Sequence, residues 1–321
     1  MAQPSEDYRS SAIDRKQRWH GLKKPLKRLL AWRVPHFFMR VGLRFAPDIR
    51  STGRLPAPAH LKEVVGSVQD RQFVMLRPAD CVVAKELYWG AGRRPRPEDD
   101  FAVELFAALA QRADVMLDIG AYTGIFTLVG TTVNPQLEAH AFEFLPDVYT
   151  ALFENCVRND VLSRVTLHHV AIGDPTARPV APVGTSDSAL PSFYSPRMQF
   201  SDGVVVRSMA LDRMATFLPS QANVLIKIDV EGSENEVLRY GQELLRSFRP
   251  DMLCEVLAGV GDGRDLQQLL DPHGYRYYLV RGGDIVLKPS IEPDQRFRDW
   301  LFSTLDPAQL RNVGRISVVE G

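Results

Sequence analysis

The sequence has few cysteines and no long apolar segment, and both features exclude certain classes of protein. Its three cysteines, Cys81, Cys156 and Cys254, are widely spaced and form no Cys-x-x-Cys pair. This argues against a disulfide framework and against a zinc site. No stretch approaches the ~18 apolar residues of a membrane-spanning helix, and residues 1–10 are too polar for a signal peptide. We therefore expect a cytoplasmic protein with a hydrophobic core of its own.

The chain also lacks net charge, but its charges are unevenly distributed. Residues 1–50 hold 12 Lys and Arg against 4 Asp and Glu, so the part after residue 50 is net acidic. An acidic body works against holding a phosphate backbone. We therefore predict no nucleic-acid partner, and an RNA steered by the basic N-terminus is the alternative that stays open.

The first 100 residues lack regular periodicity. Residues 1–20 are polar and predict a disordered tail. Residues 21–45 mix basic and apolar side chains, and Pro25 and Pro35 divide them into short helices. This segment is either a peripheral contact with anionic lipid or an acidic partner, or a cap whose apolar face packs on the body. We predict a basic extension over 21–100 that is helical or irregular.

A run of three arginines and two prolines occupies residues 93–97, ahead of a helix expected near 100–111. Such a run is able to contact phosphate. The favoured interpretation is a solvated linker, because proline and arginine are typical of exposed connections.

From Asp114 onward, strand and helix patterns alternate. We predict seven strands at 115–119, 138–142, 165–170, 224–229, 252–256, 275–280 and 284–288. Helices are expected at 124–131, 146–158, 233–246 and 264–271. This order predicts a doubly wound, mostly parallel, Rossmann-like α/β sheet. The domain would span 101–290, with 291–321 as a C-terminal tail packing on it, and the Pro-, Ser- and Gly-rich residues 175–207 as an inserted loop near the substrate.

A glycine-containing loop follows the first of these strands. Its spacing is Gly-x-x-x-Gly, from Gly120 to Gly124, with Asp118 two residues ahead. A dinucleotide site would have three glycines, because a pyrophosphate rests on the helix that follows. S-adenosylmethionine has no phosphate, and its cationic groups suit a nearby carboxylate. We predict that this loop contacts that cofactor through Asp118, Gly120, Ala121, Tyr122, Thr123 and Gly124.

An acidic residue ends the next strand, about 20 residues further on. Glu143 in this position accepts hydrogen bonds from the two ribose hydroxyls of an adenosine. Phe144 follows it, and His169 and Ala171 come at the end of the third strand, where the adenine edge would lie. We predict cofactor contacts for all four, although a histidine at such a position is more often structural.

Two more carboxylates follow the strand at 224–229. Asp229 and Glu231 emerge where open α/β sheets bind ligands, and Lys227 lies on the same side of the strand. We predict that these three residues are catalytic, with Asp229 or Glu231 removing a proton from an acceptor hydroxyl. Glu255, at the end of the strand after, either lines the same crevice or is held in a buried ion pair. The three carboxylates suit a divalent ion, but no metal is predicted.

Taken in order, these motifs resemble the FkbM family of methyltransferases. The matching segments are Asp-x-Gly-Ala-x-x-Gly from Asp118, Ala-Phe-Glu ending at Glu143, Val-Ala-Ile-Gly-Asp at 170–174, the block at 227–232, and Glu255-Val256. The resemblance covers about 114–256. It departs at Tyr122, where the family usually has Asn. It implies a class I methyltransferase fold and methyl transfer to hydroxyls of sugars or natural products.

The sequence therefore predicts an S-adenosylmethionine-dependent O-methyltransferase. Its acceptor would be a hydroxyl of a sugar, glycan or natural product, bound as a small-molecule or carbohydrate partner. Two alternatives stay open, a non-catalytic binding module with the same fold and an NAD-dependent oxidoreductase. No oligomeric state is predicted.

Overall fold

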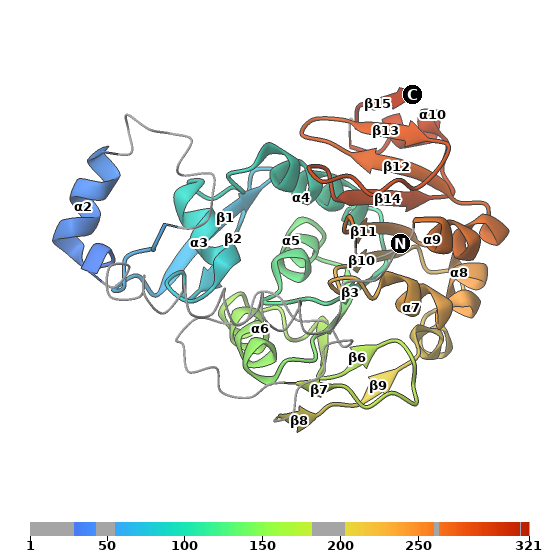
Figure 1. The fold of residues 1–321 in the computed structure, drawn as a ribbon, viewed down its shortest axis with the longest axis horizontal. Coiled ribbons are helices and arrows are strands. Elements are labelled where there is room, and N and C mark those ends of the chain that lie inside the picture. Colours follow the sequence, from blue (N-terminus) through green and yellow to red (C-terminus); the bar gives the residue numbers. More distant parts are fainter. Residues whose placement is uncertain (1–28, 43–54, 182–202, 260–262, 315, 321) are drawn as a thin grey trace, which may run out of the picture.

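The computed structural model describes residues 29–42, 55–181, 203–259, 263–314 and 316–320 (Figure 1). The disordered tail predicted at 1–20 lies outside these residues, and so does most of the inserted loop predicted at 175–207. The described ends of that loop pair with each other, β7 (Val180–Ala181) antiparallel to β8 (Val204–Val205). Close by, β6 (Ala171–Ile172) runs parallel to β9 (Ser208–Met209).

The described residues build one large sheet, which confirms the predicted Rossmann-like class. Nine strands follow the order β15-β13-β12-β14-β11-β10-β3-β4-β5. The five at one side are parallel, namely β3 (Val115–Ile119), β4 (Glu138–Phe142), β5 (Val165–His168), β10 (Val224–Ile228) and β11 (Asp251–Glu255). The chain leaves β3 towards β4 and later returns to its other side as β10. The point where the strand order reverses therefore lies between β3 and β10, and ligands bind there in open α/β sheets.

The C-terminal segment corrects two expectations. Residues 291–321 are no tail on the surface of the domain, because β14 (Asp299–Ser303) inserts antiparallel between β11 and β12 (Arg276–Val280). At the edge of the sheet, β15 (Val318–Glu320) pairs with the predicted strand β13 (Ile285–Lys288). Together β14 and β15 raise the number of strands from the predicted seven to nine. The β14 sequence is a short, continuous apolar run with no period of its own, and such runs do not distinguish a buried strand from a packed helix.

Helices cover both faces of the sheet (Figure 1). One core layer packs α4 (Pro97–Ala110), α5 (Ile125–Val133) and α6 (Pro146–Arg158) on side chains such as Met116, Ala141 and Leu253. The other contains α7 (Glu234–Arg239), α8 (Gln242–Phe248) and α9 (Gly263–Leu270), with Leu117, Ile226 and Cys254 from the same strands. Alternate residues of a strand point to opposite faces, so each strand contributes to both layers. All three cysteines are buried as free thiols.

One of the predicted helices is divided into two in the structure. The single helix expected at 233–246 ends at Arg239, and α8 begins at Gln242. Gly241 stands between them, where an added Cβ would lie 2.8 Å from Leu211 Cδ2. The close approach of Leu211 explains why the chain turns at a glycine here.

The N-terminal extension contains a strand pair that the sequence did not predict. β1 (Glu63–Val68) and β2 (Arg71–Leu76) form an antiparallel hairpin, so the extension over 21–100 is not only helical or irregular. The backbone of β2 hydrogen-bonds to α6, because Val74 and Leu76 donate their N–H groups to the Asn159 and Asn155 amide oxygens at 2.8 Å. The hairpin leads into α3 (Val82–Trp89), whose N-cap residue Cys81 contacts Thr123 Oγ1, in the loop before α5, through its Sγ at 3.2 Å.

Further out, α2 (Arg33–Gly42) is a separate ten-residue helix at the edge of the molecule (Figure 1). Among the described residues, no helix is long and apolar enough to cross a bilayer.

Candidate active site

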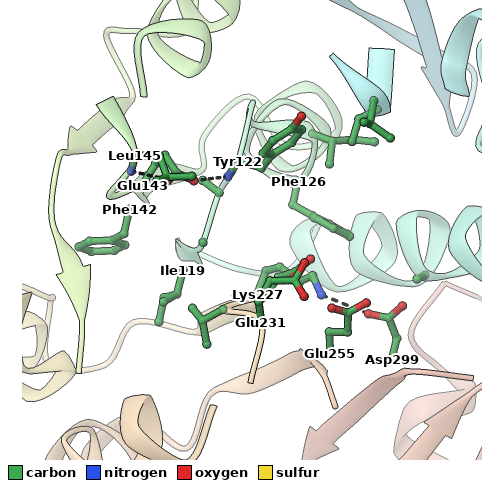
Figure 2. A pocket seen from close by; sticks show the side chains of 18 of the residues that line it. Ile119, Tyr122, Phe126, Phe142, Glu143, Leu145, Lys227, Glu231, Glu255 and Asp299 are labelled. Carbon is green, nitrogen blue, oxygen red and sulfur yellow. Dashed lines mark hydrogen bonds and ion pairs between the residues drawn. The ribbon is translucent and has the colours of Figure 1, made fainter. Parts of the chain in front are cut away.

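A cavity of about 360 Å³ opens at the carboxyl ends of the parallel strands (Figure 2). This volume is in the usual range of small-molecule sites, roughly 300–1,000 Å³. Of the thirteen residues predicted from the sequence, nine line it: Gly120, Ala121, Tyr122, Glu143, Phe144, Ala171, Lys227, Asp229 and Glu231. They come from the ends of β3, β4 and β10 and from the start of β6, because parallel strands end at the same edge of a sheet.

The glycine loop is shaped by close backbone packing. Gly120 has φ +77°, and a Cβ there would lie 1.9 Å from the carbonyl oxygen of Asp229. Tyr122 has φ +50°, a left-handed conformation that is uncommon for a bulky residue. The loop therefore lets the ends of β3 and β10 approach each other, which brings Asp229 to the cavity.

We expect Gly120→Ala to lower the free energy of unfolding by about 2–4 kcal/mol. The added methyl group meets backbone at Asp229 and raises the cost of the positive φ. Thermal or urea unfolding measures the change. Gly283→Ala is the matched control, because nothing lies within 4 Å of its Cβ position. Equal stability of the two variants would contradict this account.

Four residues predicted as cofactor contacts lie outside the cavity lining, and each has a structural partner. Asp118 is 1% exposed, and its Oδ2 accepts hydrogen bonds from the N–H (2.9 Å) and Oγ1 (2.6 Å) of Thr127 in α5. Burial raises the pKa of its carboxyl to about 6. Asp118 thus anchors the first turn of α5 to β3. Because Asp118 does not line the cavity, its carboxylate is not placed to attract a cationic cofactor bound there.

The other three residues, Thr123, Gly124 and His169, also make structural contacts. The backbone oxygen of Thr123 accepts a hydrogen bond from Asn155 Nδ2 at 2.8 Å. A Cβ on Gly124, where φ is +91°, would lie 2.5 Å from Leu152. His169 is exposed and hydrogen-bonds through Nε2 to the Phe144 oxygen at 3.1 Å, so the structural alternative holds for it.

Glu143 lies at one end of the cavity and is 5% exposed. Its Oε2 accepts the N–H of Tyr122 at 3.0 Å, and its Oε1 accepts the N–H of Leu145 at 2.8 Å (Figure 2). Burial raises the pKa of its carboxyl to about 7, against the lowering effect of these backbone donors. Each oxygen keeps a lone pair for a further hydrogen bond. The Glu143 carboxylate is therefore held in place, with room to accept two further hydrogen bonds.

Apolar side chains surround this end of the cavity. They are Phe142, Phe144, Leu145, Val170, Ala171 and Ile172. The Phe142 ring is itself held by stacking on His168, with centroids 4.4 Å apart. An apolar wall beside one fixed carboxylate fits a flat, weakly polar ring joined to a diol.

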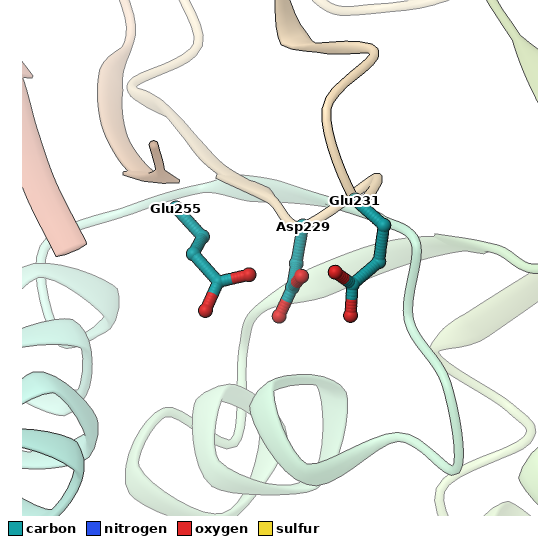
Figure 3. Close-up of side chains that lie close together, drawn as sticks. All are labelled: Asp229, Glu231 and Glu255. Atoms are coloured by element: carbon teal, nitrogen blue, oxygen red, sulfur yellow. The ribbon is translucent and has the colours of Figure 1, made fainter. Parts of the chain in front are cut away.

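The other end of the cavity is strongly charged. Asp229, Glu231 and Glu255 each offer an oxygen within 4.8 Å of the others, and their carboxylates point into the same space (Figure 3). Burial, and next the repulsion of Asp229, raise the pKa of Glu231 to about 8. Burial also raises the pKa of Glu255 well above its ordinary value. Three such groups attract a cation or take up a proton.

The backbone holds Glu231 in a strained turn. Its φ is +51°, and the next residue, Gly232, donates its N–H to Glu234 Oε1 at 2.8 Å. Residues in this conformation cost about 1–3 kcal/mol and cluster at functional sites. The turn points the Glu231 side chain into the cavity.

Lys227 is a buried cation beneath these carboxylates. It is 1% exposed, its Nζ lies 3.1 Å from Asp299 Oδ1, and the Phe126 ring centroid is 5.0 Å away. Burial alone lowers the pKa of Lys227, but the surrounding Asp299, Asp229 and Glu255 outweigh it and raise the pKa. A lysine that stays protonated accepts no proton. Lys227 is therefore placed to hold the neighbouring carboxylates in position, and its catalytic role stays a prediction.

Several residues at the charged end were missed. Arg94 and Asp99 line it from the run at 93–97 and the start of α4, so that run is no solvated linker. Arg94 pairs with Glu86 of α3 at 2.9 Å. From the C-terminal segment, Arg298 pairs with Glu255 at 2.9 Å. Both expectations for Glu255 therefore hold, because it lines the cavity and is also ion-paired. In the sequence, the cluster of three arginines at 93–97 was the one sign that this segment reaches the site.

The fold is that of a class I methyltransferase. In the seven strands counted from β5, one antiparallel strand, β14, lies between β11 and β12. The cavity lies where the strand order reverses. A family model, the methyltransferase FkbM domain, matches residues 118–277. The chain therefore contains an FkbM methyltransferase domain over these residues.

Known proteins were also compared with the whole chain. No curated protein matches its sequence. Among solved structures, methyltransferase FkbM from Methylobacillus flagellatus is similar to the chain, with 18% identity and a TM-score of 0.40 over 60% of this chain and 44% of that chain. Fibrillarin from Aeropyrum pernix, in complex with natively bound S-adenosyl-L-methionine, has 14% identity and a TM-score of 0.36 over 63% and 76%. The chain thus spans less than half of the Methylobacillus protein.

Proposed function

We propose that this protein transfers a methyl group from S-adenosylmethionine to a hydroxyl oxygen of a small-molecule or carbohydrate acceptor. One observation carries the proposal. A single cavity has an apolar end with the fixed acceptor Glu143 and a charged end with Asp229 and Glu231. The two ends suit the two halves of that cofactor, a nucleoside and a cationic amino acid.

The residues of the cavity fit the cofactor. The apolar wall around Phe142 and Ala171 would take the adenine, and the free lone pairs of Glu143 would take the ribose hydroxyls. Asp229, beside Gly120, would take the ammonium group. When bound, S-adenosylmethionine supplies a methyl group activated by a sulfonium ion. The remaining chemistry falls to side chains of this chain.

Glu231 is the proposed proton acceptor. A hydroxyl is a poor nucleophile until its proton is removed, and a base is most useful when its pKa is near the working pH. The pKa of about 8 at Glu231 meets this condition, and its carboxylate lines the cavity. Among the described residues Glu231 forms no ion pair, whereas Glu255 is paired with Arg298. Glu231 is therefore free to bind and release a proton.

Calorimetric titration tests the cofactor half of the proposal. We expect S-adenosylhomocysteine to bind the wild-type protein and Glu143→Gln to weaken it roughly 10- to 100-fold, since hydrogen bonds to a charged group are lost. Binding should also weaken as pH falls below about 7, because the Glu143 carboxyl then becomes protonated. The variant should lack this pH dependence.

Glu138→Gln is the matched control, because Glu138 is exposed at the opposite end of the same strand. No binding of S-adenosylhomocysteine by the wild type would overturn the proposal. If NADH bound instead, the oxidoreductase alternative would stand, and if neither bound, the binding module would. With binding established, candidate acceptors are screened by mass spectrometry for the gain of one methyl group.

A further inference from the structure

We propose that the outer face of α2 is a peripheral docking surface for an anionic lipid bilayer. Three large apolar side chains of α2 and two from the turn just before it are exposed. They form what we call the α2 patch: Leu29 (52% exposed), Trp32 (66%), Phe37 (62%), Phe38 (67%) and Val41 (39%). This inference is independent of the methyl transfer proposed above.

The patch is exposed because the opposite side of this segment is already packed. His36 is 4% exposed, its Nε2 lies 2.9 Å from the Tyr88 hydroxyl, and its ring lies 5.4 Å from that of Trp89. Just before α2, the Ala31 oxygen accepts the N–H of Ala59 at 3.0 Å. The segment is thus fastened to α3 and its surroundings, and α2 extends away from the sheet (Figure 1).

Apolar exposure of this kind is unusual for a surface helix. Single exposed apolar residues are common on soluble proteins, but a contiguous group marks an interaction site. Two of the five are phenylalanines with touching rings, 5.7 Å apart at their centroids. The expected occupant is therefore apolar where it meets the α2 patch.

The charge of the surrounding sequence specifies that occupant. Residues 21–45 contain seven Lys and Arg and neither Asp nor Glu, and two of the arginines, Arg33 and Arg40, belong to α2 itself. Basic residues near anionic lipid each contribute about 1 kcal/mol. A bilayer offers both an apolar interior for Trp and Phe and an anionic surface for Lys and Arg. The combination is the composition of a helix lying in the plane of a membrane interface.

Vesicle binding by the full chain tests this inference. The protein is floated with vesicles of phosphatidylcholine alone and of phosphatidylcholine mixed with phosphatidylserine. We expect binding to the mixed vesicles only, weakened by added salt. Phe37→Ser combined with Phe38→Ser should weaken the partitioning at least about tenfold, from the apolar area lost.

Phe217→Ser is the matched control, because Phe217 is equally exposed (65%) on another part of the surface. Both variants should unfold at the wild-type temperature, which separates loss of binding from loss of fold. Three results would each overturn the inference. These are no vesicle binding by the wild type, equal binding by the double variant, and a wild-type dimer that the double variant converts to a monomer. The last would assign the α2 patch to self-association.

Discussion

Replacing Glu231 with glutamine is expected to lower kcat for methyl transfer by about 10²- to 10⁴-fold, the usual contribution of a positioned general base. Glutamine keeps the size of the side chain but accepts no proton. For the wild type, kcat should rise with pH and level off above about 8, because below its pKa the Glu231 carboxyl is already protonated. The variant should lose this rise, which a purely structural role would leave in place.

Two controls sharpen this experiment. Glu243→Gln makes the same change on the surface, where Glu243 accepts a hydrogen bond from Ser247, and should leave kcat unchanged. The second control is chelation with EDTA, because Asp229, Glu231 and Glu255 also suit a divalent ion. Activity lost on chelation and restored by Mg²⁺ would assign Glu231 to metal binding. A variant within threefold of wild type would exclude both roles.

Replacing Lys227 with methionine should destabilise the protein by about 3 kcal/mol, the lower end for breaking a buried ion pair. Methionine fills a similar volume beside Phe126, so the loss is mainly electrostatic. Asp299, Asp229 and Glu255 would share a partly buried space without the cation that now lies among them. Urea unfolding at pH 7 measures the change.

The loss should also depend on pH, and its sign follows from the carboxylates. Burial already raises the pKa of Glu255, and loss of the Lys227 charge raises it further. A carboxyl with a raised pKa favours the folded state only while it is protonated. The deficit of the variant should therefore grow as the pH rises. Adding Asp299→Asn removes one of the repelling charges and should restore part of the stability. Lys62→Met, at an exposed position, should change stability by less than about 0.5 kcal/mol. A pH-independent loss would contradict the electrostatic explanation.

The parallel half of the sheet and much of the site could be predicted from local sequence. One apolar run ends just before Gly120 and another just before Asp229. Each run predicts a buried strand, and the residue after it is predicted to lie at the carboxyl end of that strand. Because parallel strands end at one edge, residues from separate strands are predicted to meet there, as Glu143 and Asp229 do. Asp118 shows the limit of this argument. Its position after an apolar run is the same, but it lies inside the strand and bonds to Thr127.

The charged end of the cavity could not be predicted in the same way. Lys227 and Asp299 are 72 residues apart, and Arg94 reaches the cavity from a segment before the domain begins. No local period relates such residues. Asp299 arrives there because β14 pairs antiparallel with β11, which puts Asp299 opposite Glu255.

By itself, the sequence determined the class of sheet, the loop after β3 and the carboxylates that end β4 and β10, because each depends on neighbours within a few residues. The tertiary structure alone decided which carboxylates are matched by cations and which are not. Glu255 pairs with Arg298 and Asp299 pairs with Lys227, whereas Glu231 lies beside Asp229 with a raised pKa. The protonation of a side chain depends on the charges and burial around it, and these come from elements that only the folded chain brings together.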